Sequence, residues 1–173
     1  MRAVFLDRDG VINVEKEYLH TAEAFEFING VFNACKHFQH LGYKLVIVTN
    51  QSGIGRGYYT DDDFETLTLW MLEQFRKHGV LIDAVYHCPH TPDAACSCRK
   101  PNPGMMLQAA QEHNIDLSDS WMIGDKESDI EAALAAGIGH TILLRSGHAI
   151  DEKTSPADYL LDSIKETINI INT

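Results

Sequence analysis

The sequence lacks a hydrophobic run long enough to cross a membrane. None of its apolar stretches approaches the roughly 20 residues that a membrane-spanning helix needs. The N-terminal "MRAVFLDRDG" contains too short an apolar run for a secretory signal peptide, and it shows no cleavage site of small residues. We therefore expect an intact cytoplasmic protein with no membrane partner.

Basic residues are scarce as well. The chain has 14 Lys and Arg against 25 Asp and Glu, which gives a formal net charge of −11 at pH 7. This charge argues against nucleic acid as a general partner, because phosphate backbones require a basic protein face. A small anionic substrate is not excluded, since salt screens charges beyond about 8–10 Å and a few local cations can control a pocket. The candidate cations are Arg8, Arg56, Arg99, Lys100 and Lys126.

No repeat, low-complexity tract or linker divides the chain. Its 173 residues, of which 45% are hydrophobic, suffice for one well-packed domain and are too few for two. We therefore predict a single domain over residues 1–173, and we expect a monomer.

Short apolar runs alternate with helical patterns along the whole chain. The apolar runs predict buried strands at residues 3–6, 44–48, 83–87, 121–124 and 141–145. The helical spacing and its start and stop signals predict helices near residues 31–41, 60–75, 103–113, 129–136 and 163–171. Continuous apolar strands that alternate with helices are typical of an α/β fold, a doubly wound parallel sheet with helices on both faces.

Polar residues follow four of the predicted strands, where such sheets bind ligands. They are Asp7 and Asp9, residues 49–52, the cysteine-rich loop that ends at Arg99 and Lys100, and Asp125. The two carboxylates of "DRDG" point the same way in an extended segment, and carboxylate oxygens suit Mg²⁺. With the metal, Asp7 is a candidate nucleophile toward phosphorus.

The other polar groups fit the same chemistry. Asp9 could protonate a leaving oxygen and later deprotonate a water. The Thr49 hydroxyl and the Lys100 ammonium could align the phosphoryl group. A lone D-x-D would indicate only a solvated turn, but four matching strand ends favour a catalytic site.

These motifs also carry a family resemblance. "VFLDRDGVIN", "VTNQSG", the Lys of "CRKPNPG" and "IGDKESD" resemble, in order, the four motifs of haloacid dehalogenase-type phosphatases. The combination of "TNQSGIGRG", "CPH", "CRKPNPGM" and "GDK" is narrower and resembles the heptose-bisphosphate phosphatases, with histidinol-phosphatase domains as close relatives. The resemblance implies a Rossmann-like core, with Asp7 as nucleophile and Asp9 as general acid and base. It also implies that Asp7, the Asp9 carbonyl and Asp125 bind Mg²⁺.

Substrate contacts follow partly from this resemblance and partly from charge. The resemblance implies contacts from Arg99 and Lys100 and from two loops, Glu15, Lys16, Glu17 and Tyr18, and Thr49, Asn50, Gln51 and Ser52. Arg8 and Lys126 are cationic candidates beside the acidic motifs. Arg56, in a glycine-rich turn that fails the Walker A pattern, is a candidate for a distal phosphate. Asp129 is expected to support the site rather than to bind metal.

Cys88, His90, Cys96 and Cys98 form the pattern C-x-H-x₅-C-x-C. Three thiolates and one imidazole complete a tetrahedral Zn²⁺ site, and a site with no open position is structural. Disulfide pairing is the competing interpretation, which the short spacing of Cys96 and Cys98 and a reducing compartment disfavour. The zinc loop of residues 88–98 would then hold Arg99 and Lys100 over the phosphate. Cys35 is expected in the core, and the other histidines, His148 included, are given no function.

No segment between motifs is long enough for a cap domain, since only eleven residues separate Gly10 from Ala22. The resemblance implies a Mg²⁺-dependent enzyme that removes the C7 phosphate of heptose 1,7-bisphosphate through an aspartyl-phosphate, on the nucleotide-heptose route to surface polysaccharide such as lipopolysaccharide. A histidinol-phosphate phosphatase is the alternative that the short zinc loop favours. A zinc-stabilised binding module without catalysis is the non-enzyme alternative, and loss of Asp7, Asp9, Lys100 or Asp125 would have indicated it.

Overall fold

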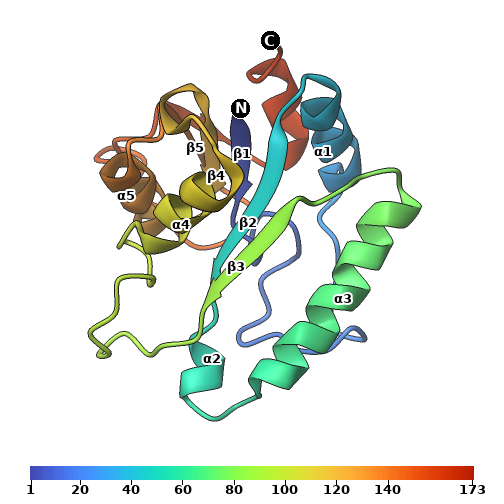
Figure 1. Ribbon diagram of the computed structural model, residues 1–173, viewed down its shortest axis with the longest axis vertical. Coiled ribbons are helices and arrows are strands. Elements are labelled where there is room, and N and C mark those ends of the chain that lie inside the picture. Colours follow the sequence, from blue (N-terminus) through green and yellow to red (C-terminus); the bar gives the residue numbers. More distant parts are fainter.

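The computed structural model describes residues 1–173, and its centre is a six-stranded sheet (Figure 1). The strands are β1 (Ala3–Leu6), β2 (Lys44–Asn50), β3 (Ala84–Cys88), β4 (Trp121–Gly124), β5 (His140–Leu144) and β6 (Tyr159–Leu161). They lie in the order β3-β2-β1-β4-β5-β6, and every neighbouring pair is parallel. The predicted α/β fold is confirmed. The short edge strand β6 was not predicted, because an apolar run of three residues is too short to indicate a strand.

The helices are α1 (Val31–His40), α2 (Ser52–Gly55), α3 (Asp61–Lys77), α4 (Gly104–His113) and α5 (Glu127–Ala136), with 3₁₀ turns η1 (Leu117–Asp119) and η2 (Ile164–Asn169). The predicted start of α3 is confirmed: the Thr60 hydroxyl accepts from the Asp63 N–H, and the Asp63 carboxylate accepts from the Thr60 N–H. The terminal segment differs from the prediction, since η2 is a short 3₁₀ helix. The glycine-rich turn contains α2, one helical turn that no periodic pattern indicates.

Alternating side chains of the strands enter two hydrophobic layers. Val4 and Leu6 of β1 pack in a core of 24 buried residues with α1, α3 and η2, whereas Ala3 and Phe5 pack in a core of 13 with α4 and α5. Figure 1 shows α1 and α3 on one side of the sheet and α4 and α5 on the other. The central strands are therefore buried on both faces, which explains their continuous apolar sequences.

The chain order reverses at β1. The chain moves outward from β1 through β2 to β3, and then crosses to β4 and continues through β5 to β6 on the other side. In doubly wound sheets the crevice for a ligand lies at such a reversal, beyond the carboxyl ends of the strands. Asp7 and Asp125 directly follow the two strands that meet there, β1 and β4. No cap domain covers this edge.

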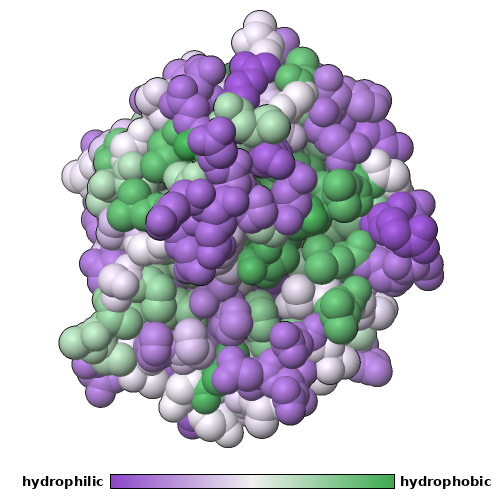
Figure 2. Space-filling model, viewed as in Figure 1, coloured by the Kyte–Doolittle hydropathy of each residue, from purple (hydrophilic) through white to green (hydrophobic).

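None of the helices is long and apolar enough to cross a bilayer. Apolar patches on the face in Figure 2 are interrupted by polar residues. Single exposed side chains such as Leu69 and Leu81 are common on protein surfaces.

Candidate active site

Three carboxylates and one lysine meet at the carboxyl edge of the sheet. The Lys100 Nζ donates to Asp7 Oδ1 at 3.0 Å and to the Val48 carbonyl at 2.9 Å, and it lies 2.6 Å from Asp129 Oδ1. All four charged groups are buried. Although burial alone lowers the pKa of a lysine, the charges of Asp129 and Asp7 raise the pKa of Lys100. Lys100 is therefore a fixed cation at this point.

Asp129 joins two elements of the site. Asp129 lies in the first turn of α5. Its Oδ2 accepts from the backbone N–H groups of Asp125 and Lys126, at 3.0 and 3.1 Å. Gly124 permits this contact, because a Cβ at that position would lie 2.3 Å from the Asp129 Cβ. Asp129 thus ties the end of β4 to α5 with one oxygen and holds Lys100 with the other.

The acidic cluster has room for a cation beyond Lys100. Asp7, Asp125 and Asp129 each offer a carboxylate oxygen within 4.8 Å of the others. The Oδ1 of Asp125 is buried without a hydrogen-bond partner. Burial and the Asp129 charge raise the pKa of Asp125 to about 6, and the same two causes raise the pKa of Asp7 well above its usual value. Closely spaced carboxylates whose negative charge Lys100 alone does not neutralise fit Mg²⁺, which prefers oxygen ligands.

The other oxygen of Asp125 is held by the loop after β5. Asp125 Oδ2 accepts from the backbone N–H of His148 at 3.1 Å and lies 2.5 Å from its ring Nδ1. Gly147 and Gly10 allow this approach, since a Cβ at either would come within 2.2 Å of Asp125 Oδ2. The sequence pattern assigns no function to His148, and the structure corrects this. Applying the strand-end rule to the fifth predicted strand would have indicated it.

Asp9 lies beside the cluster and is surrounded by donors. It accepts from the Arg8 guanidinium at 3.1 Å, from the Asn13 amide at 3.0 Å and from the Gln51 amide at 3.0 Å. Although burial acts in the opposite direction, the Arg8 charge and these hydrogen bonds hold the pKa of Asp9 below its usual value. Asp9 is therefore ionised in the free protein.

Two predicted substrate contacts do not face the pocket. Arg8 is 2% exposed, and its guanidinium donates to Asp9 and to the Leu19 carbonyl between the rings of Phe25 and Phe64. The side chain of Lys16 donates to the Ala24 carbonyl at 2.8 Å. These two assignments are corrected, because local charge in a sequence does not show to which side a side chain turns.

A pocket of about 330 Å³ opens above Asp9. It joins a smaller cavity of about 60 Å³ that Asp7, Asp9, Lys100 and Asp129 line. The predicted residues that border the larger pocket are Glu15, Glu17, Tyr18, Asn50, Gln51, Ser52, Arg56, Arg99 and Lys126. Leu19, Tyr59 and His148 also border it and were not predicted. Thr49 is buried beneath, with its Oγ1 accepting from the Gln51 amide at 2.8 Å.

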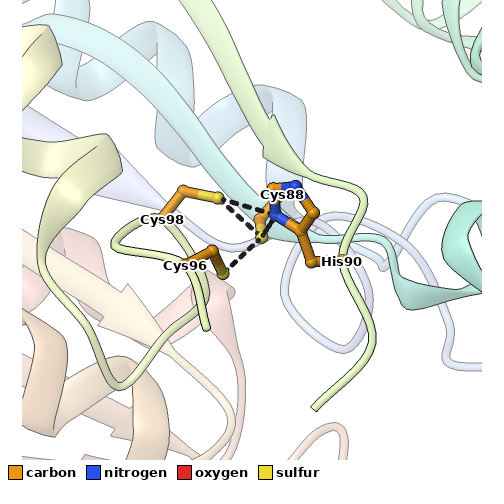
Figure 3. A group of neighbouring side chains, drawn as sticks. All are labelled: Cys88, His90, Cys96 and Cys98. Carbon is orange, nitrogen blue, oxygen red and sulfur yellow. Dashed lines mark hydrogen bonds between the residues drawn. The ribbon is translucent and has the colours of Figure 1, made fainter. Parts of the chain in front are cut away.

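The predicted zinc ligands converge from the end of β3 and the loop that follows (Figure 3). Cys88 Sγ lies 2.8 Å from Cys98 Sγ and 3.7 Å from Cys96 Sγ, and the His90 Nδ1 lies 3.3 Å from both Cys88 and Cys98. No disulfide forms. Four soft donors within 4.8 Å of one another fit Zn²⁺. Cys35, by contrast, is buried in the core, where burial raises its pKa to about 12.

The exit of this loop is joined to the active-site edge. The Asn50 side chain donates to the Lys100 carbonyl and accepts from the Lys100 N–H, both at 3.1 Å. Arg99 borders the pocket and its guanidinium donates to the His90 carbonyl at 3.4 Å. The position of the cysteine loop therefore bears directly on where Arg99 and Lys100 lie.

Comparison with known proteins shows the family of this chain. The HAD-hydrolase-like family model matches residues 97–167. A Yersinia pestis protein named D-glycero-β-D-manno-heptose-1,7-bisphosphate 7-phosphatase is 47% identical over 172 residues, which cover 95% of this chain and 92% of that protein. A Helicobacter pylori protein of the same name is 53% identical over 83% of each chain. The chain belongs to this heptose-bisphosphate phosphatase family.

Solved structures of the family share the fold. The heptose 1,7-bisphosphate phosphatase of B. bronchiseptica, crystallised with magnesium and phosphate, has a TM-score of 0.86 and 27% identity over 98% of this chain and 97% of that one. The Burkholderia thailandensis enzyme has a TM-score of 0.71 and 27% identity over the full length of both chains.

The raised pKa of Asp125 predicts an unusual pH dependence for this member of the family. A carboxyl group whose pKa is higher in the folded than in the unfolded state binds more protons when folded, so stability falls as pH rises through about 4–6. Without Mg²⁺, we expect the free energy of unfolding of the wild type to fall by about 2 kcal/mol more than that of Asp125→Asn between pH 4 and 7.

Urea denaturation at several pH values measures this difference. Mg²⁺ is expected to cancel it, since a metal binds the ionised carboxylate. If the free energy of unfolding had the same pH dependence in the wild type and in Asp125→Asn, the raised pKa of Asp125 would be contradicted.

Proposed function

We propose that this protein hydrolyses the C7 phosphate of D-glycero-β-D-manno-heptose 1,7-bisphosphate. The observation that carries the proposal is the meeting of Asp7, Lys100 and Asp125 at the carboxyl edge of the sheet, where Asp7 and Lys100 line a cavity, in a chain of this family. The β anomer is taken from the names of the relatives. The product would serve nucleotide-heptose synthesis for lipopolysaccharide, which would place the enzyme in the cytoplasm.

Asp7 is the proposed nucleophile. One of its carboxylate oxygens attacks the phosphorus of the C7 phosphate, and the bond between phosphorus and the C7 oxygen breaks. Lys100, at 3.0 Å from Asp7, stabilises the charge on the phosphoryl oxygens. The Thr49 hydroxyl accepts from Gln51 at 2.8 Å and donates only a long hydrogen bond, of 3.5 Å, to the Asn50 carbonyl, so its hydrogen could turn to a phosphoryl oxygen instead.

Asp9 is the proposed acid and base. In the first step it donates a proton to the departing C7 oxygen, and in the second it takes a proton from the water that attacks the aspartyl-phosphate. The low pKa of Asp9 suits the second role. For the first role Asp9 must take up a proton in the complex, where the negative phosphate favours its neutral form.

Asp7, Asp125 and the Asp9 carbonyl would hold Mg²⁺. When bound, the ion supplies neutralisation of charge on the phosphoryl group. The buried, unpartnered Oδ1 of Asp125 supports this assignment.

The pocket rim offers groups for the rest of the sugar. Arg56, Arg99 and Lys126 are its cations and are suited to the C1 phosphate. Glu15 and Glu17 offer acceptors for sugar hydroxyls, and Tyr18 offers an aromatic face. No cap domain contributes, so these loops would provide the selectivity.

We also infer that the cysteine cluster binds a structural Zn²⁺. Its four donors leave no position for a reacting water, and its loop ends at Arg99 and Lys100. The cluster would therefore position those two residues and take no part in the chemistry.

The deciding experiment compares kcat/KM for phosphate release from the two anomers of heptose 1,7-bisphosphate and from histidinol phosphate, with Mg²⁺ present. We expect the β anomer to be preferred by at least about 10-fold. The two anomers direct the C1 phosphate differently, and the cations of the pocket rim would contact it in one of these orientations. A preference for histidinol phosphate would keep the mechanism and reassign the substrate. Absence of turnover for all three would favour the binding-module alternative.

A further inference from the structure

Gln51 holds the acid and base residue rather than the substrate. Its amide nitrogen donates to Asp9 Oδ2 at 3.0 Å and to Thr49 Oγ1 at 2.8 Å. The side chain is only 3% exposed. An amide group has two N–H donors, and both are used inside the protein.

The hydroxyl of Tyr59 determines which way this amide faces. It donates to Gln51 Oε1, and the Arg8 guanidinium lies 3.5 Å from the same oxygen. Burial raises the pKa of Tyr59 to about 12, so the hydroxyl keeps its proton and remains a donor. With the amide turned over, its carbonyl would face the carboxylate of Asp9, and two acceptors would oppose each other.

Packing keeps the Tyr59 ring in place. It stacks on the ring of His20 with centroids 5.0 Å apart and planes within 6°. The ring also lies against Gly53, where a Cβ would come 2.2 Å from the Tyr59 Cε1. The hydroxyl therefore has little freedom to move away from Gln51.

We propose that Tyr59 is a positioning residue for the proton-transfer step, acting through the Gln51 amide on Asp9 and Thr49. This inference rests on the proposed role of Asp9. A general acid must lie within hydrogen-bond reach of the leaving oxygen, and small displacements of a reacting group reduce rates strongly. Losing the hydroxyl of Tyr59 lets the amide rotate and leaves Asp9 Oδ2 with one fewer fixed donor.

A leaving-group series distinguishes this role from a structural one. Poor leaving groups need the acid and good ones do not, so misplacing Asp9 slows phenyl phosphate more than 4-nitrophenyl phosphate, and 2,4-dinitrophenyl phosphate least. These esters are similar in size, so differences in binding largely cancel. The parameter to compare is kcat/KM, which includes only steps up to departure of the phenol and not hydrolysis of the phosphoenzyme.

For Tyr59→Phe we expect kcat/KM to fall about 10-fold with phenyl phosphate and less than about 2-fold with 2,4-dinitrophenyl phosphate. Gln51→Met should show the same pattern with a larger loss. Tyr86→Phe is the matched control, because the Tyr86 hydroxyl also donates to a side-chain oxygen, Glu112 Oε1 at 2.5 Å, but Tyr86 does not border the pocket. It should leave all three values unchanged.

An equal loss with all three esters, or no loss in Tyr59→Phe and Gln51→Met, would overturn the positioning role. Asp9→Asn separates this result from a failure of the proposed function. It should show the steepest dependence on leaving group. If Asp9→Asn shows none, Asp9 is not the acid, and the positioning role is overturned together with that assignment.

Discussion

Replacing Asp7 by Asn is expected to abolish phosphate release while the protein remains folded. An amide cannot attack phosphorus as a carboxylate does, so no aspartyl-phosphate forms. Loss of a covalent nucleophile typically lowers kcat by about 10⁴-fold or more. Asn keeps the size of Asp7 and can still accept a hydrogen bond from Lys100, now 3.0 Å from the carboxylate. The sheet around β1 should therefore be little disturbed.

The measurement is phosphate release from heptose 1,7-bisphosphate, together with mass spectrometry of acid-quenched protein. The wild type should carry a phosphoryl group on Asp7, and the variant none. Asp62→Asn is the matched control, since Asp62 is an exposed carboxylate in the first turn of α3, and it should keep full activity. Appreciable turnover by Asp7→Asn would contradict the nucleophile assignment.

Loss of zinc is expected to destabilise the fold, unlike the replacement of Asp7 by Asn. Between Cys88 and Gly104 the chain has no regular helix or strand, and most of its residues after His90 are exposed. Metal ligation would thus be its main restraint. For Cys98→Ser we expect loss of the metal and a fall in Tm of about 10 °C, which corresponds to roughly 3–4 kcal/mol in a chain of this size.

Activity should fall in Cys98→Ser because Arg99 and Lys100 follow the loop directly. We expect kcat/KM to fall about 10–100-fold, the usual cost of misplacing supporting groups. The residual activity should still require Mg²⁺, since the acidic cluster lies on other elements. Zinc content by atomic absorption, Tm and steady-state kinetics test these expectations together.

Cys35→Ala provides the comparison for this experiment. It removes a cysteine from the core without touching the cluster, so zinc content should stay at the wild-type level even if packing is weakened. A zinc-free Cys98→Ser protein that is as stable and as active as the wild type would refute a structural zinc.

Much of the fold followed from local patterns in the sequence. The buried strands can be recognised in the sequence because a parallel strand covered on both faces is apolar along most of its length, as in "AVFL" and "KLVIV". The start of α3 follows from Thr60 and Asp63, which satisfy each other's backbone donors locally. Segments whose structure depends on distant partners were missed or misjudged. The edge strand β6 exists through its pairing with β5, and η2 is packed against α1.

The chemistry proposed for this protein follows from residues that can be identified in the sequence alone. The carboxylates, Lys100 and the cysteine loop follow successive strands, and parallel strands bring their carboxyl ends to one edge whatever lies between them. The directions in which these side chains point became evident from the folded chain. Arg8 faces Asp9 instead of the pocket, His148 reaches Asp125 from β5, and Tyr59 sets the amide of Gln51. The physical reason is that a strand end determines where a residue lies, whereas its direction depends on packing and hydrogen bonds with residues far away in the chain.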